Sequence, residues 1–376
     1  MQDKQVSFTK TDVTGEKEVE GATITVKEKE TDKIVDEWIS GKEDHKIKGL
    51  EERKTYILSE IVTPEDYVKA TDIEFTVTEE KVNQEVNMKD KQVKVSKTTA
   101  GGDEVVGASM QIRDEFGNII DEWISDGKEH YATGLVEGKK YILHEDLAPA
   151  GLNLANDIEF EVPYAKENQK VEMIDTINEV SKVDEKGNLL KGAEMTVTSN
   201  KTKNIIDKWI SGQHIFDVTD EMKSQLKEIG KAEGMYVDNE DSTVQYSIAK
   251  NKGKDDYTVM FVEDGITTYT NIDLDGNETR HMIQGLEAGE EYVLKETKTP
   301  DGYATFKTQT FTAEEGKDTS LSMVDEDTKG EVSKQDITTK KELEGAKLKV
   351  TDKDGKVIDE WTSGGSRTIM FPCRTV

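Results

Sequence analysis

Cysteine is almost missing from this sequence: Cys373 is the single cysteine among 376 residues, which excludes a disulfide within the chain. No run of about 18 apolar residues is present, so the sequence predicts no transmembrane helix. Residues 1–20 also lack the apolar core of a signal peptide. Because only 34% of the residues are hydrophobic and another 34% are charged, each hydrophobic core must be small.

Basic residues are far fewer than acidic residues in this sequence. The chain has 50 Lys and Arg residues against 79 Asp and Glu residues, which gives a formal net charge of −29. Nucleic acids and anionic membranes are bound through an excess of basic residues, so we expect this chain to contact neither. Solubility is a sufficient explanation for the acidity.

Residues that would hold a metal ion or a cofactor are dispersed. The sequence has no phosphate-binding glycine-rich loop, and its five histidines fall at no metal-ligand or catalytic-triad spacing: His45, His130, His144, His214 and His281. Segment 273–278 (Asp-Leu-Asp-Gly-Asn-Glu) carries oxygen ligands as a calcium loop does, although a polar turn explains it as well. We expect no cofactor and no bound metal.

A repeated motif organises the chain. The motif Asp-Glu-Trp-Ile-Ser-Gly at 36–41 recurs in similar form at 121–126, 207–212 and 359–364, and these copies contain all four tryptophans. A Gly-Ala pair precedes each copy, at 21–22, 107–108, 192–193 and 345–346. We predict four units: repeat 1 (4–91), repeat 2 (92–177), repeat 3 (178–328) and a truncated repeat 4 (329–376). We interpret the tryptophans as strand packing rather than as a platform for carbohydrate.

Within each repeat, short alternating segments are separated by turn residues, and helical periodicity is almost absent. This pattern predicts an antiparallel β-sandwich for each repeat. The junctions between repeats contain no linker rich in Pro, Gly or Ser, so we expect a fairly stiff array.

Repeat 3 is longer than the others because of an insert at about 213–280. We predict a short helix at 220–229, capped by Thr219 and ended at Gly230. Alternating segments then predict strands at 243–249, 257–262 and 267–274, with a turn at 263–265. Such a hairpin-rich insert on a loop is a common way to add a recognition surface.

Both ends of the chain look cut. Residues 1–6 resemble 88–93, so Met1 stands where the last strand of a preceding repeat would place a buried methionine. After Gly364 the sequence, Cys373 included, matches nothing in the other repeats. We interpret the chain as an internal fragment of a longer protein.

Three strand ends in each complete repeat place a charge on the apolar face. The segment Tyr56-Ile57-Leu58-Ser59-Glu60 is an example, because residues two apart in a strand point to the same side. The charged positions are Lys10, Glu60 and Asp90 in repeat 1, Lys97, Glu145 and Asp175 in repeat 2, and Lys182, Glu296 and Asp325 in repeat 3. The spacing from Glu to Asp stays nearly constant even though the insert lengthens repeat 3.

Three converging charges are costly in an apolar core, and burial favours the neutral forms of amines and carboxyl groups. A neutral lysine beside a neutral aspartic acid is a nucleophile beside an electrophile, and the glutamate can shuttle protons between them. Condensation would leave an amide that ties the first strand of the repeat to the last, as a disulfide would elsewhere. The alternatives are a buried salt bridge, or three strand-end charges that reach solvent.

The sequence resembles the Cna B-type (SpaA-like, prealbumin-like) repeats of Gram-positive surface adhesins and pilins. The resemblance rests on Lys10-Thr11-Asp12, Gly21-Ala22, Trp38-Ile39-Ser40 and the segment from Lys295 to Tyr303, and it covers nearly the whole chain outside the insert and the tail. It implies an all-β fold of tandem reversed immunoglobulin-like β-sandwiches, here with a helix-and-hairpin insert in repeat 3. It also implies an autocatalytic isopeptide bond between Lys and Asn or Asp, assisted by Glu.

Carried over by position, Lys10, Lys97 and Lys182 would be the isopeptide lysines, and Glu60, Glu145 and Glu296 the proton-shuttling acids. We choose Asp90, Asp175 and Asp325 as acyl partners. Asn87 is a rival in repeat 1, but its parity points it outward and its equivalents are Glu172 and Ser322. Asp3 and Lys334 would stay unpaired in this fragment, so repeat 4 should not crosslink.

We therefore expect a structural stalk segment of a Gram-positive, cell-wall-anchored surface adhesin, outside the cell and in contact with its own neighbouring repeats. Its chemistry would be single-turnover and intramolecular, so we do not expect an enzyme. The alternative is a ligand-binding adhesin whose insert contacts a host matrix protein or glycan. A sortase-polymerised pilin shaft is a weaker third reading, because the sequence has no pilin motif and no sorting signal.

Overall fold

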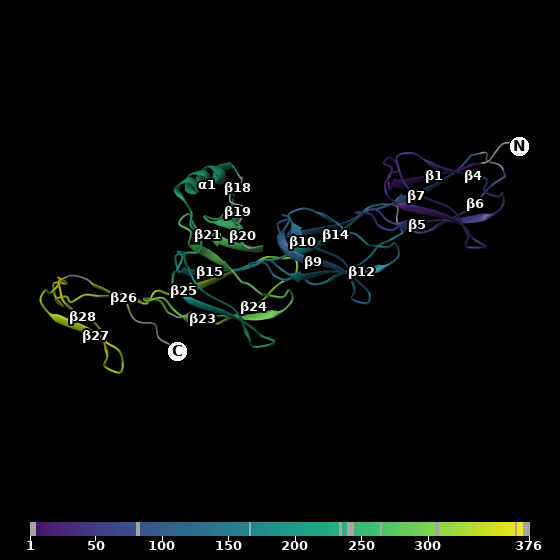
Figure 1. The fold of residues 1–376 in the computed structure, drawn as a ribbon. Helices are drawn as coiled ribbons and strands as arrows, with labels where there is room; N and C mark the ends of the chain where they lie inside the picture. The colour runs from purple at the N-terminus through teal and green to yellow at the C-terminus, as the bar shows by residue number, and fades with distance from the viewer. Residues whose placement is uncertain are drawn as a thin grey trace. The chain divides into compact units, whose positions relative to one another are not determined.

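Strands dominate the computed structural model, which describes residues 5–79, 83–164, 167–232, 235–238, 244–263, 265–304, 308–364 and 367–370 (Figure 1). The chain divides into two units: Met1–Ala148 with Ala155–Asp175 (unit 1), and Pro149–Leu154 with Thr176–Val376 (unit 2). Among the described residues, no helix has the length and apolar character needed to span a bilayer. Asp3 and Cys373 lie outside the described residues.

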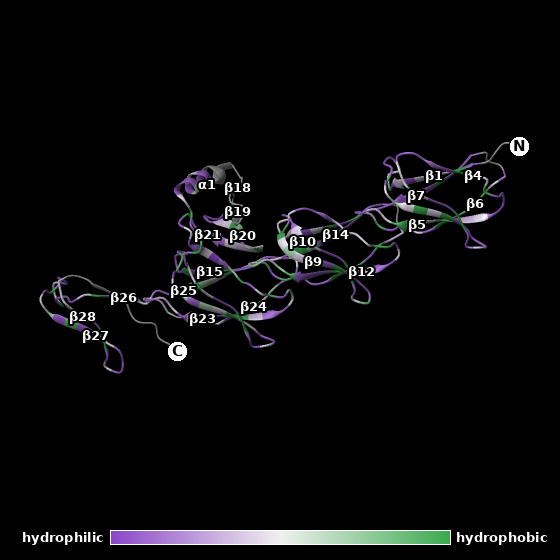
Figure 2. Ribbon diagram, viewed as in Figure 1, coloured by the Kyte–Doolittle hydropathy of each residue, from purple (hydrophilic) through white to green (hydrophobic). Residues whose placement is uncertain are grey.

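Repeat 1, in unit 1, is a sandwich of two sheets with strand orders β4-β1-β7 and β3-β2-β5-β6. Alternate residues of the strands point inward, so Phe8, Val26 and Leu58 join one hydrophobic core. Figure 2 shows hydrophobic residues along strands such as β5 and hydrophilic residues over most loops. The strands are β1 (Gln5–Asp12), β2 (Thr23–Glu28), β3 (Ile34–Ile39), β4 (His45–Lys48), β5 (Thr55–Val62), β6 (Ile73–Thr76) and β7 (Asn83–Asp90).

The first and last strands of the repeat are parallel neighbours, whereas the sequence pattern predicted an antiparallel sandwich. β1 pairs with β7 in the register Phe8↔Val86 and Lys10↔Met88. The other pairs of repeat 1 are antiparallel. Alternation assigns residues to a face of a sheet but carries no information about the direction of the partner strand, which is why the sequence pattern could not reveal this pair.

Repeat 2 has the same arrangement, with sheets β11-β8-β14 and β10-β9-β12-β13. Its first and last strands, β8 and β14, are again parallel. The strands are β8 (Val93–Thr99), β9 (Val106–Asp114), β10 (Ile119–Asp126), β11 (His130–Tyr131), β12 (Lys140–Leu147), β13 (Ile158–Glu161) and β14 (Gln169–Asp175).

Repeat 3, in unit 2, has the sheet β17-β16-β23-β24 and a seven-stranded sheet, β18-β19-β20-β21-β22-β15-β25, in which β15 and β25 are parallel. β22 pairs with β15 as β4 pairs with β1, so the strands of the insert extend this sheet beyond its usual edge. The strands are β15 (Asn178–Asp184), β16 (Glu194–Ser199), β17 (Ile205–Ile210), β18 (Met235–Asp238), β19 (Val244–Lys250), β20 (Tyr257–Glu263), β21 (Ile266–Ile272), β22 (Glu278–Met282), β23 (Glu291–Lys298), β24 (Gln309–Thr312) and β25 (Thr319–Asp325).

The insert also contains helix α1 (Asp220–Ala232), which lies over β18 and β19 (Figure 1). The predicted cap is present, because the Met222 N–H donates to Thr219 Oγ1 (3.2 Å). The predicted end at Gly230 is wrong: a glycine inside a helix costs only about 1 kcal/mol, so it does not force an end. β18 was not predicted, and residues 243 and 264 of the predicted strand and turn lie outside the described residues.

A buried ionic network fastens the insert to repeat 3. Arg280 on β22 pairs with Glu179 on β15, and its Nε lies 2.6 Å from Asp256 Oδ2, just before β20. Lys254 Nζ also lies 2.6 Å from Glu179 Oε1. Glu179, Asp256 and Arg280 are all at least nine-tenths buried. The insert is therefore joined to the sandwich by charge pairing as well as by strand pairing.

The polar segment at 273–278 forms a hydrogen-bonded turn. Asp273 accepts hydrogen bonds from the backbone N–H groups of Asp275 (2.8 Å) and Asn277 (2.9 Å). The same side-chain turn occurs at Asp114 and Asp184, outside the insert. No group of three or more metal-ligating side chains occurs among the residues that the structure describes. The turn is thus held by hydrogen bonds to the Asp273 side chain.

Repeat 4 differs from the others. Its strands β26 (Lys329–Val332), β27 (Lys347–Thr351), β28 (Val357–Thr362) and β29 (Arg367–Met370) form two separate two-stranded sheets, β26-β29 and β27-β28. The large apolar side chains Ile337, Leu343 and Val357 are exposed. Lys334 is exposed as well.

Candidate functional site

The first strand, the last strand and β5 of repeat 1 bring three charged side chains together in the core. Lys10 Nζ contacts Asp90 Oδ1 directly and lies 3.1 Å from Glu60 Oε1. Lys10 is 4% exposed, Glu60 0% and Asp90 1%, so no member of this trio is open to solvent. The alternative in which the strand-end charges reach solvent therefore does not hold in repeat 1.

Repeats 2 and 3 contain the same trio. Lys97 Nζ contacts Asp175 and lies 3.0 Å from Glu145 Oε2. Lys182 Nζ contacts Asp325 and lies 3.3 Å from Glu296 Oε1. These six side chains are buried. The nine residues singled out from the sequence thus form three buried Lys–Asp pairs, each with a glutamate beside it, as isopeptide sites would require.

The topology explains how each trio forms. In the parallel ladder, Lys10 stands opposite Met88, two residues before the Asp12↔Asp90 pair. The lysine and the aspartate therefore lie on the same face of neighbouring strands, close enough for their side chains to meet. Glu60 comes from the opposite sheet, where it pairs with Ile24 on β2. The trio thus joins the first strand to the last and also spans the two sheets.

Burial changes the protonation of the aspartates. Desolvation raises the pKa of Asp90 to about 7, although the charge of Lys10 lowers it, and the neighbouring Glu60 raises it further. The same causes raise the pKa of Asp175 to about 8 and that of Asp325 to about 6. Protonated aspartic acid is therefore accessible near neutral pH in each trio.

A backbone N–H orients the glutamate. The Ala70 N–H donates to Glu60 Oε2 (2.9 Å), and the Ala155 N–H donates to Glu145 Oε2 (2.8 Å). Both donors lie ten residues after the glutamate, on the loop that follows its strand. The corresponding residue of repeat 3, Phe306, lies outside the described residues.

The rival acyl partner points away from the trio. Asn87 is exposed, and its side chain is hydrogen bonded to Thr9 (2.6 Å) and Thr11 (3.2 Å) on the outer face of β1. Its outward direction follows from strand parity, as predicted. Asn87 and Lys10 therefore lie on opposite faces of the same sheet.

Three histidines are not scattered, which corrects the sequence-based interpretation. The rings of His45, His130 and His281 stack on Trp38, Trp123 and Trp209, with centroids 4.1, 3.9 and 4.0 Å apart. Each imidazole Nε2 lies 2.9 Å from the aspartate that opens the tryptophan motif, namely Asp36, Asp121 and Asp207. The common spacing from tryptophan to histidine in repeats 1 and 2 was the available signal, and the insert hides it in repeat 3.

These stacks are structural. Trp38 lies on β3 and His45 on β4, so the pair closes one side of the sandwich between edge strands of different sheets. Trp38 also packs against Phe8, with ring centroids 5.5 Å apart. The tryptophans therefore contribute to packing, as expected, and do not offer an exposed stacking platform.

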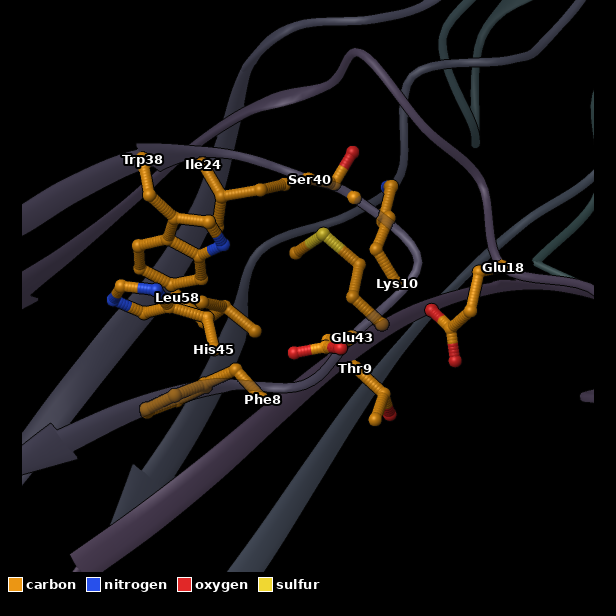
Figure 3. A pocket seen from close by; sticks show the side chains of 12 residues that line it. Phe8, Thr9, Lys10, Glu18, Ile24, Trp38, Ser40, Glu43, His45 and Leu58 are labelled. Carbon is orange, nitrogen blue, oxygen red and sulfur yellow. The ribbon is translucent and has the colours of Figure 1, made fainter.

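A small cavity lies beside the trio of repeat 1. Figure 3 shows Trp38 and His45 at one end of it and Lys10 and Glu18 at the other. Its volume of about 10 Å³ is close to the smallest that holds one water molecule. Lys10 thus lines a space of about the size of one water molecule.

Comparison with known proteins agrees with this architecture. A family model described as the SpaA prealbumin-like fold domain matches residues 4–92, 91–177 and 237–327. The third match begins inside the insert, later than the start of repeat 3 that we predicted. No protein in a search of curated sequences matches the chain.

Several solved structures are similar at low identity. The TIE protein of Bacillus anthracis is 16% identical over 87% of this chain, which spans about half (51%) of that protein, with a TM-score of 0.21. The shaft pilin SpaA of Lactobacillus rhamnosus GG is 16% identical over 63% of this chain and 97% of the pilin, with a TM-score of 0.24. The pilus adhesin SpaC of the same organism is 9% identical over 86% of this chain and 43% of SpaC, with a TM-score of 0.30.

Proposed function

Because the chain belongs to the family of SpaA prealbumin-like fold domains, we propose that it is a stalk segment of a Gram-positive surface adhesin whose complete repeats are each closed by a Lys–Asp isopeptide bond. The observation that carries this proposal is the threefold occurrence of one buried trio across a parallel pair of first and last strands. A single buried salt bridge would be unremarkable. The same costly arrangement in three repeats calls for a common purpose.

The chemistry is a condensation within the chain. The neutral Lys10 Nζ attacks Cγ of the protonated Asp90, the Nζ–Cγ bond forms, and a Cγ–O bond breaks. Glu60 carries a proton from the nitrogen to the departing hydroxyl, which leaves as water. The cavity lined by Lys10, with a volume close to the smallest that holds one water molecule, is the nearest space for that water in our proposal. Relative to the ionised form of the pair, the neutral amide has two buried charges fewer and avoids their desolvation cost.

The intact mass of the denatured chain tests this proposal. Each bond removes one water, so three bonds should lower the mass by about 54 Da from that of the unmodified chain. The variant Glu145→Ala should lose one bond and regain about 18 Da, because repeat 2 then lacks its proton shuttle. Glu129→Ala, which removes a partly exposed acid of the same repeat, serves as the control. An unmodified wild-type mass would contradict the proposal.

A second candidate function is recognition by the insert. The insert has its own hydrophobic cluster, which includes Leu226, Ile248 and Val259, so its outer surface can vary without disturbing the trio of repeat 3. A host matrix protein or a glycan is the class of partner that we would test. Binding of the whole chain to arrays of both classes, lost when residues 213–280 are replaced by the three-residue loop 42–44 of repeat 1, would favour this function.

A further inference from the structure

The junction between repeats 1 and 2, inside unit 1, contacts the loop that orients Glu60. The Lys69 N–H donates to the Leu135 carbonyl (2.9 Å), and Lys69 forms a parallel β-bridge with Val136. Two residues later, the N–H and Oγ1 of Thr71 both donate to Glu137 Oε2, at 3.1 and 2.7 Å. The residues on both sides of Ala70 are therefore held by repeat 2.

Glu137 is well placed to hold this loop. Its other carboxylate oxygen, Oε1, lies 3.0 Å from Nζ of Lys91, which is 2% exposed and also donates to the Pro163 carbonyl. Burial by itself would raise the pKa of Glu137, but hydrogen bonds from Thr71 and Lys91 lower it below its usual value. The ionised carboxylate of Glu137 thus accepts hydrogen bonds from Thr71 in the loop of repeat 1 and pairs with Lys91, which lies between β7 and β8.

The next junction has the same backbone pattern. In unit 2 the Leu154 N–H donates to the Leu286 carbonyl (3.1 Å), and Leu154 forms a parallel bridge with Glu287. The following residue along the chain is Ala155, whose N–H orients Glu145. Leu154 is thus bridged to a Gly-Leu turn within unit 2, as Lys69 is within unit 1.

We propose that repeat 2 positions the glutamate of repeat 1, with Glu137 acting as a positioning residue for the Lys10–Asp90 bond. The inference rests on the isopeptide function proposed above. Ala70 can donate to Glu60 from the right place only when Lys69 and Thr71 are docked on repeat 2. The bond of repeat 1 then forms at full rate only after repeat 2 has folded, which orders bond formation along the chain.

The test follows each bond separately during synthesis of the full chain. The protein is made in a cell-free system, samples are quenched in denaturant and digested, and the linked and unlinked peptides are quantified by mass spectrometry. Glu137→Ala should slow Lys10–Asp90 formation about tenfold or more, a fraction of the 10²–10⁴ that a positioned acid or base supplies. Lys97–Asp175 and Lys182–Asp325 should form at their wild-type rates in the same molecules.

Two variants make the result specific. Glu137→Gln keeps an acceptor oxygen for Thr71 and should restore most of the rate, whereas a merely destabilised repeat 2 would slow its own bond as well. Glu129→Ala is the matched control, because Glu129 forms its ion pairs with Lys94 (3.1 Å) and Lys170 (3.3 Å) inside repeat 2. Glu137→Ala could be uninformative if it prevented repeat 2 from folding. Thr71→Val then tests the same contact from repeat 1, because it removes the hydroxyl that donates to Glu137, and it should also slow Lys10–Asp90 formation.

The outcomes separate the two proposals. Normal bonds in the wild type with an unchanged Lys10–Asp90 rate in Glu137→Ala and Thr71→Val would overturn the coupling and leave the isopeptide function intact. The absence of every bond from the wild type would overturn both.

Discussion

Lysine, glutamate and aspartate are ordinary surface residues, and it is their burial that makes the trios chemically unusual. A charged amine and two carboxylates in water have no tendency to condense. In the core of repeat 1 the pKa of Asp90 is raised to about 7 by desolvation, so the protonated, electrophilic form is present at neutral pH. The reactivity that we propose for Asp90 therefore comes from its burial rather than from the residue type.

The choice of acyl partner can be tested by substitution. Asp90→Ala should abolish the bond of repeat 1, so the mass deficit relative to the unmodified variant chain should shrink by one water, about 18 Da. Asn87→Ala should leave all three bonds in place, because Asn87 is exposed on the outer face of β7. A peptide map in which Lys10 remained linked in Asp90→Ala would show that the partner was misassigned.

His281 predicts a pH dependence for repeat 3. Burial lowers its pKa, but hydrogen bonds to Asp207 and Glu278 outweigh this and raise it to about 9. Because the folded-state value lies above the unfolded value of about 6.5, this stabilisation is complete below pH 6.5 and is lost as the pH rises through 9. The loss amounts to roughly 3 kcal/mol at most.

The imidazole proton signals of His281, followed by NMR from pH 5 to 10, should titrate near pH 9. In Glu278→Gln the midpoint should move down, since one of the two acidic partners is removed. A midpoint near 6.5 in the wild type would mean that the ring is not paired with these acids in solution.

At the scale of elements, a close backbone contact joins the segment Pro149–Leu154 to strand β21 of the insert. The segment Pro149–Leu154 lies in unit 2, where Ala150 pairs with Thr268 on β21. Gly151 has a φ of +96°, and a Cβ added there would lie 2.5 Å from the Tyr269 carbonyl oxygen. Only glycine meets both conditions, which explains its place in this loop.

The Arg280 network offers a sharper test of how the insert is attached. Arg280→Ala leaves Glu179 and Asp256 buried without their shared cation, which typically costs 3–5 kcal/mol. Hydrogen exchange in peptides from β20 and β21 should accelerate in this variant, while exchange in repeats 1 and 2 stays unchanged. Lys201→Ala, which removes an exposed ion pair with Glu290, should have little effect. Unchanged protection of the insert in Arg280→Ala would show that strand pairing alone holds it.

At the scale of the whole molecule, the position of the proposed bonds matters for tension. Each repeat is entered through its first strand and left through its last, and Lys10 and Asp90, 80 residues apart, are the points that a bond would connect. Force applied to the ends of the chain would pass through that amide instead of unfolding the strands between them. A stalk built in this way resists extension without a disulfide.

Single-molecule pulling measures this directly. An unlinked repeat 1 should release a contour length of about 270 Å when it unfolds, at roughly 3.3–3.6 Å per residue. The wild type should show no such step for any linked repeat, and Glu60→Ala should show one, because its first and last strands are no longer joined. A step of that length from a chain whose mass proves all three bonds would contradict the mechanical role.

Much of this protein follows from its sequence. The tryptophan motif predicted the repeats, and strand parity placed Lys10, Glu60 and Asp90 on an apolar face while directing Asn87 outward. These are local properties, because the side-chain period of a strand is two residues whatever the strand pairs with. The all-β fold and the family were predictable for the same reason, since a repeated local pattern is visible without knowledge of contacts.

Only the tertiary structure decided which strands are neighbours. The parallel pairing of β1 with β7, the stacking of His281 on Trp209, the addition of the insert to the sheet of repeat 3 and the contact of Glu137 with Thr71 all join residues far apart in the chain. Hydrogen bonds between strands are satisfied equally well by many partners, so the choice depends on the packing of the whole repeat. Local alternation therefore determined the chemistry available to each strand, and long-range packing determined which of those groups meet.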